Sequence, residues 1–133
     1  CSVICVSESV CVQHPLYPFC VDQNPAPKML NVPIPPYTRG MDNREIIDMS
    51  RIPRHEELQP EMFFISAGFD AHREDDMGQL GLTEQDFAWI TQRIKDIAKR
   101  YSKGRIVSLL EGGYVMSSFA RSVGAHLRVL ADL

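Results

Sequence analysis

The stretch MFFISAGFDAHRED, residues 62–75, turns from apolar to charged within a few positions. Its first six residues, 62–67, are apolar or small and rich in Phe and Ile, which is typical of a buried strand. Gly68 then leads into Asp70 and His72. A carboxylate and an imidazole at the tip of a strand indicate either a polar turn or a ligand or catalytic site.

A helix and a second strand follow the first strand along the chain. Thr83 is a good N-cap, and Gly104 marks the end of the apolar helical spacing that starts there. The residues that recur on one face are Phe87, Ile90, Ile94, Ile97 and Tyr101. Residues 106–110 read as a second strand. The order strand, helix, strand predicts two parallel strands joined by a crossover helix.

The N-terminal part of the chain reads less regularly. Residues 2–12 are apolar and β-branched, which predicts a strand, and a proline-rich loop leads from there to an extended segment at residues 29–37. Residues 41–58 have helical spacing through Ile46, Ile47 and Met49. Pro53 is expected to kink or end that helix, because proline lacks the backbone N–H donor.

The C-terminal residues predict a last helix. Ser117 or Ser118 can cap it, and its buried face is expected to carry Phe119, Val123, Leu127 and Leu130. Taken together, the elements predict an α/β fold, a partial three-layer sandwich with a mainly parallel sheet. Residues 1–133 are expected to form a single domain.

Composition narrows the class of protein. The 133 residues are 44% hydrophobic and 23% charged, with a formal net charge of −3, which argues against a nucleic-acid-binding surface. No apolar run approaches the roughly 20 residues of a membrane span. We therefore expect a cytoplasmic protein without nucleic-acid or membrane partners. The four cysteines never form Cys-x-x-Cys, which argues against a structural zinc knuckle.

Polar residues follow both predicted strands of the central unit. Asp70 comes just after the first strand, and Glu111, Gly112, Gly113 and Tyr114 come just after the second. The carboxyl ends of parallel strands share one edge of a sheet, where ligands bind in open α/β folds. The simpler alternatives are that Asp70 closes an Asx-turn, that the two glycines form an ordinary turn and that Tyr114 begins a helix.

Other titratable residues have simple interpretations. Asp75 and Asp76 are expected to be solvated loop charges, and His55 and His126 to be surface or interface residues on helices. His72 lies two positions from Asp70. In an extended segment the two side chains would point the same way, as a small metal-binding pair.

The segments SAGFDAHREDDMGQLGLTEQDFAWIT, residues 66–91, and SLLEGGY, residues 108–114, resemble the C-terminal part of the histone deacetylase superfamily. The likeness is to its bacterial class II-like deacetylases and acetylpolyamine amidohydrolases. HPLYPF and NVPIPP, at residues 14–19 and 31–36, are similar to segments that precede this region in the family. The resemblance covers residues 9–133 and implies a partial arginase/deacetylase fold.

The resemblance also implies roles for particular residues. Members of the family hydrolyse acetyl-lysine or acetyl-amine amides with one zinc ion, held by two aspartates and a histidine. On this pattern Asp70 is a zinc ligand, and Tyr114 donates to the developing oxyanion. Gly112 and Gly113 match glycines beside the acyl tunnel, and Tyr17 falls where an aromatic residue lines it. The pattern gives His72 no role.

The chain departs from the family pattern upstream. The family takes its other two zinc ligands from an Asp-x-His segment and its base from an adjacent pair of histidines. Here no two histidines are adjacent, and the only Asp-x-His is residues 70–72 themselves. We therefore expect a C-terminal portion of a deacetylase domain that holds no zinc and does not catalyse the reaction alone.

Two alternatives stay open beside this interpretation. The chain is a small-ligand or protein-binding module that uses the strand-end crevice, or it is an amidohydrolase completed by a second chain or by Asp70 and His72 as a metal pair. An acetylated amine is a substrate only if the site is completed. A partial sheet leaves edges and apolar faces exposed, so we also expect a homo-oligomer.

Overall fold

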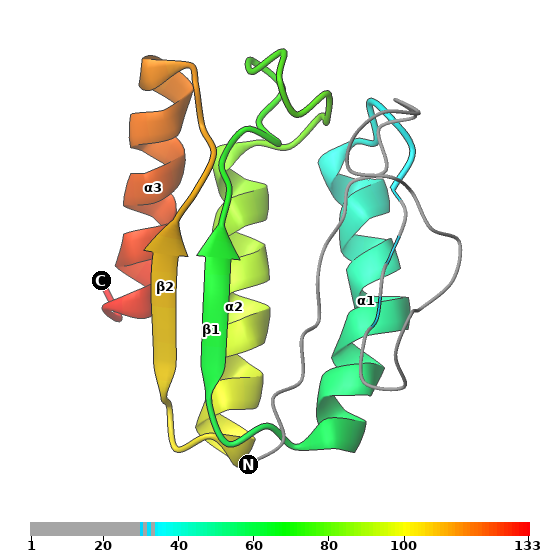
Figure 1. Cartoon of the computed structure of the whole chain (residues 1–133), viewed down its shortest axis with the longest axis vertical. Coiled ribbons are helices and arrows are strands. Elements are labelled where there is room, and N and C mark those ends of the chain that lie inside the picture. Colours follow the sequence, from blue (N-terminus) through cyan, green and yellow to red (C-terminus); the bar gives the residue numbers. More distant parts are fainter. Residues whose placement is uncertain (1–29, 31, 33) are drawn as a thin grey trace.

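The computed structural model describes residues 30, 32 and 34–133, and their helices and strands alternate along the chain (Figure 1). The elements are α1 (Gly40–Leu58), β1 (Phe63–Ala67), α2 (Glu84–Tyr101), β2 (Ile106–Leu110) and α3 (Met116–Leu130). The strand expected at residues 2–12 and the predicted site residue Tyr17 lie outside the described residues.

The two strands form a parallel pair, with Phe63 opposite Ile106 and Ala67 opposite Leu110. Helix α2 connects them, and in Figure 1 α2 and α3 lie together behind the sheet while α1 lies beside α2. Both strands therefore end at the same edge. The predicted α/β class, the parallel pairing and the connecting helix are confirmed.

Two apolar clusters hold the helices against the sheet. One lies toward the carboxyl ends of the strands and is made of Ile34, Ala67, Phe69, Leu80, Leu82 and Phe87. The other lies toward their start and is made of Ile47, Ile52, Phe63, Ile97 and Ala98. Phe69 contacts the rings of Phe87 and Phe119 at centroid distances of 5.3 and 6.0 Å. The residue next to Asp70 is therefore anchored in the core.

The start of α2 is fixed by its cap and by α1. The Asp86 carboxylate accepts hydrogen bonds from the Thr83 N–H and hydroxyl, both at 2.8 Å, which confirms the predicted N-cap. Arg44 of α1 pairs with the same carboxylate at 2.6 Å. A Cβ on Gly40 would lie 2.2 Å from that carboxylate, so the first turn of α1 packs here only because residue 40 is glycine.

We expected Pro53 to kink or end this helix. Helix α1 does not end there and continues to Leu58. Ile47 and Ile52, which both precede the proline, are buried, and their packing against α2 and β1 stabilises the helix. Met49, expected on the buried face, is 75% exposed.

Helix α3 also differs from its prediction. It begins at Met116 with Val115 as N-cap, and Ser118 lies inside the first turn, where its hydroxyl donates to the Val115 carbonyl. Leu127, expected in the core, is 55% exposed, whereas His126 is buried. The buried residues of α3 are Ser118, Ser122 and His126. The buried face of the helix is therefore shifted by about one residue from the predicted face.

His126 joins three elements through hydrogen bonds. Its Nδ1 lies 2.7 Å from the Thr91 hydroxyl on α2, and its Nε2 lies 2.9 Å from the Ser108 hydroxyl on β2. The Thr91 hydroxyl donates its single hydrogen to the Phe87 carbonyl at 2.6 Å, so its oxygen must accept from Nδ1–H. Burial lowers the pKa of His126, which favours the neutral ring, and in that ring Nε2 accepts from Ser108. Of the two expectations for His126, a surface or an interface residue, the surface position is wrong.

We expect the stability of the fold to fall as the pH drops from about 6.5 to about 4. Burial, followed by the charge of Arg51, lowers the pKa of His55 from 6.5 to about 4, and burial lowers that of His126. The unfolded chain binds these protons first, so protonation favours unfolding. The urea midpoint should decrease across this pH range, and less steeply in His55→Gln and His126→Gln. Equal slopes in all three proteins would contradict the assignment.

Candidate active site

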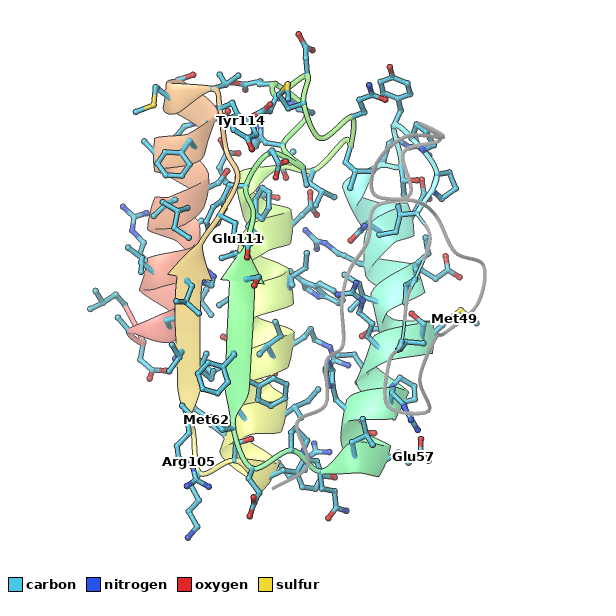
Figure 2. The ribbon with its side chains drawn as sticks, in the orientation of Figure 1. Met49, Glu57, Met62, Arg105, Glu111 and Tyr114 are labelled. Carbon is cyan, nitrogen blue, oxygen red and sulfur yellow. The ribbon has the colours of Figure 1, made fainter. Side chains whose placement is uncertain are left out.

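The two strand ends stay hydrogen-bonded beyond the strands themselves. The Glu111 N–H donates to the Ala67 carbonyl at 3.0 Å, and the Phe69 N–H donates to the Gly112 carbonyl at 2.8 Å. Figure 2 shows Glu111 and Tyr114 toward the end of the molecule where both strands finish, with Met62 and Arg105 at the other end. The predicted residues Asp70, Gly112, Gly113 and Tyr114 therefore lie on adjacent segments at one edge of the sheet.

The Asp70 carboxylate lies against two glycines. A Cβ on Gly68 would lie 3.0 Å from Asp70 Oδ1, and one on Gly112 would lie 2.8 Å from it. Burial raises the pKa of Asp70, and the charges of Asp75 and Glu111 raise it further, against a backbone hydrogen bond that lowers it. A cation beside Asp70 would offset the effect of these two charges on its carboxylate.

Gly113 is the point where the chain turns from β2 toward α3. It has a φ of 138°, which side chains rarely adopt, and a Cβ there would lie 2.6 Å from the Phe119 ring. The turn therefore packs its backbone onto the core. The next residue, Tyr114, has its side chain 62% exposed, so its hydroxyl is accessible from solvent.

Asp75 does not behave as the solvated loop charge that we expected. It is only 3% exposed, and its carboxylate accepts hydrogen bonds from the backbone N–H groups of Met77, Tyr114 and Val115 at 3.0, 2.7 and 3.2 Å. Burial alone would raise the pKa of Asp75, but these donors hold it below its ordinary value. The loop after β1 is thereby tied to the turn after β2.

His72 is not arranged as a partner for Asp70. Residues 70 and 71 form a turn rather than an extended segment, and the His72 side chain is 1% exposed. Its Nδ1 accepts from the Glu74 N–H at 3.1 Å, and its Nε2 lies 3.5 Å from a Glu84 carboxylate oxygen. The structure thus gives His72 a place in the packing of the loop, and the improvised metal pair is not supported.

Arg121 of α3 closes the outer side of this loop. Its guanidinium pairs with Glu74 at 2.8 Å and also with Glu84 at the start of α2. The hydrogen bond from Arg121 lowers the pKa of Glu84 to about 2. These exposed pairs link α3, α2 and the loop around the strand ends.

The described residues do not complete a metal centre. In the part of the chain that the structure describes, no group of three or more His, Cys, Asp or Glu side chains is placed to hold a metal ion. Catalytic zinc sites use about three protein ligands. Asp70 is one suitable oxygen ligand, and no reaction step through a metal can be built on it alone.

No helix in the described part is long and apolar enough to cross a membrane.

Comparison with known proteins decides the family. The histone deacetylase domain matches residues 11–130, nearly the whole chain. The chain belongs to the histone deacetylase family. The resemblance inferred from residues 66–91 and 108–114 is confirmed.

Individual deacetylases match the chain over a small part of their own length. Type-2 histone deacetylase 2 of Dictyostelium discoideum is 46% identical over 84 residues, which are 61% of this chain and 5% of that protein. The solved HDA15 HD domain superposes with a TM-score of 0.71 and 29% identity, covering 79% of this chain and 29% of that one. The histone deacetylase Clr3 superposes with a TM-score of 0.70 and 28% identity, covering 80% of this chain and 17% of that one.

Proposed function

We propose that this chain supplies the Asp70 and Tyr114 part of a deacetylase active site, and that it neither holds zinc nor hydrolyses an acetylated amine by itself. The observation that carries the proposal is the placement of these two residues, after two paired parallel strands, in a chain of the histone deacetylase family. Strand ends of this kind are where open α/β sheets bind ligands.

Tyr114 suits the role of an oxyanion donor. Its exposed phenol follows a turn whose backbone is held by the Phe69 and Asp75 hydrogen bonds. A fixed donor costs no reorganisation when negative charge develops on a carbonyl oxygen. Gly112 lets the turn approach the Asp70 carboxylate, and Gly113 lets it pack on the Phe119 ring, so the two glycines help to hold Tyr114 on the segment beside Asp70.

Asp70 suits the role of one zinc ligand within a larger set. Its carboxylate is half-buried, and the charges of Asp75 and Glu111 raise its pKa, an effect that a bound cation would offset. The sequence has no adjacent histidines and no second Asp-x-His segment. The remaining ligands and the histidine base are therefore proposed to come from another polypeptide segment that carries the upstream part of the domain.

The isolated chain is expected to contain no stoichiometric zinc and to show no deacetylation above background. A single carboxylate holds zinc too weakly against water, and without a base and a polarised carbonyl Tyr114 has no oxyanion to stabilise. Metal analysis and a fluorogenic deacetylase assay on the wild type, Asp70→Ala and Tyr114→Phe should give the same background values. Turnover in the wild type that both substitutions remove would show instead that the chain completes its own site.

We also propose that the uncovered face of the sheet binds a second copy of the chain. Phe63 is buried and Ser108 contacts His126 of α3, so the alternation along the strands places Phe64, Val107 and Leu109 on the opposite face. These three residues are 70%, 36% and 53% exposed. Within the described part of the chain, β1 and β2 each have one edge without a partner strand. An apolar face bounded by open edges favours association, and an identical copy offers the same face in return.

A further inference from the structure

We propose that Asp75 is a positioning residue for Tyr114, holding the tyrosine's backbone at the strand-end edge through a buried carboxylate. This inference rests on the proposed role of Tyr114 as an oxyanion donor. It adds a residue, Asp75, that lies on the loop after the other strand and does not itself reach a substrate.

The contacts of the Asp75 carboxylate divide between two segments. Oδ1 accepts from Met77 in its own loop at 3.0 Å, and Oδ2 accepts from both Tyr114 and Val115, at 2.7 and 3.2 Å. Val115 is the N-cap of α3, and its own side chain has no oxygen to accept from the first turn. The Asp75 carboxylate thus accepts from the N-cap N–H, as the N3 carboxylate of a capping box does, and places its negative charge beside the start of α3.

The loop that carries Asp75 is itself rigidly tied. The Asp75 N–H donates to the His72 carbonyl at 2.8 Å, and the Arg73 N–H donates to the Leu82 carbonyl at 2.8 Å. A Cβ on Gly78 would lie 2.1 Å from the Asp70 carbonyl oxygen, so the loop folds back closely on the residue after β1. The carboxylate that holds Tyr114 is therefore part of the same compact unit as Asp70.

This arrangement fixes the position of Tyr114 relative to Asp70, which the proposed deacetylase site requires. Asp70 is placed by β1 and Phe69, while Tyr114 follows β2 by four residues and has an exposed side chain. The hydrogen bond from Phe69 to Gly112 ties the segments before Tyr114, and Asp75 ties the segment at and after it. Asp75 thus stops the Tyr114 turn from moving relative to Asp70.

Amide hydrogen exchange of the whole chain, followed by NMR, tests the inference without any need for activity. In Asp75→Ala the Tyr114 and Val115 amides should exchange about tenfold faster or more, because charge-assisted hydrogen bonds are lost. Asp75→Asn keeps one acceptor oxygen and should give a smaller increase. The matched control is Asp76→Asn, which neutralises the exposed neighbouring carboxylate and should change neither amide.

The amide of Ala98, deep in α2, separates positioning from general stabilisation. Its exchange should stay as in the wild type while the Tyr114 and Val115 rates rise. An equal rise at Ala98, Tyr114 and Val115, or no rise at the last two, would overturn the inference. The result stands apart from the proposed deacetylase function, because a local rise would show the anchoring of Tyr114 even in a protein that never binds an acetylated amine.

Discussion

Replacing Phe64 and Leu109 together with lysine is expected to turn a self-associated protein into a monomer. Both side chains are more than half exposed on the sheet face that α2 and α3 leave uncovered. In the parallel register Phe64 lies opposite Val107, and Leu109 lies opposite Ser66, so the two substitutions place charges on both strands of one face. Two copies could not bury this face without burying unpaired ammonium groups.

The fold should survive this double substitution. Neither residue belongs to the two core clusters, and a lysine at an exposed strand position costs at most about 1 kcal/mol. Met49→Lys is the matched control, because Met49 is an equally exposed apolar residue on α1, away from the sheet (Figure 2). Light scattering across a wide concentration range should give a dimer or larger species for the wild type and this control. A wild-type protein that stays monomeric throughout would contradict the proposed self-association.

The part of the fold that the sequence predicted best is the unit from residue 62 to residue 114. Here local signals agree with one another: an apolar strand, a capped helix with a clear apolar face, and a second apolar strand. The parallel direction of the two strands then follows from the helix that connects them. Asp70, Gly112, Gly113 and Tyr114 fall at one edge for the same reason.

The features that the sequence did not predict depend on contacts between residues far apart in the chain. Asp75 is bonded to Tyr114, which is 39 positions away, and nothing in the letters of its loop distinguishes it from the exposed Asp76. His126 has two hydroxyl partners on other elements, so a polar residue stands in a buried stripe. Its spacing of seven from Phe119 was the one local signal for that position.

Pro53 and Met49 show a second limit of prediction from sequence. Proline lowers the stability of a helix, but burial of Ile47 and Ile52 outweighs that cost once α1 packs on its neighbours. The exposed side of α1 likewise includes an apolar Met49. Propensity and apolar spacing describe an isolated segment, whereas the neighbouring elements decide which of its residues are covered.

The second large effect is expected when the missing part of the site is supplied. In a chimera, this chain replaces the segment of the histone deacetylase Clr3 on which it superposes, since that structure covers 80% of the chain at a TM-score of 0.70. The rest of Clr3 provides the remainder of its domain. We expect the folded chimera to bind zinc and to deacetylate an acetyl-lysine histone peptide, because Asp70 and Tyr114 would then complete the site.

Substitutions in this chimera separate the two roles. Asp70→Ala should remove both zinc and turnover. Tyr114→Phe should keep zinc and lower kcat by about 100-fold or more, the usual loss when one oxyanion donor is removed. Tyr101→Phe is the matched control, because this half-buried tyrosine ends α2 at the opposite end of the helix from the site, and it should leave kcat unchanged.

The kcat of the Tyr114→Phe chimera, measured beside its bound zinc, tests the assignment of the strand-end site most directly. The predicted result is one zinc per folded chimera with kcat reduced about 100-fold or more relative to the unsubstituted chimera. A folded, zinc-loaded chimera whose kcat is the same with tyrosine or phenylalanine at position 114 would contradict it.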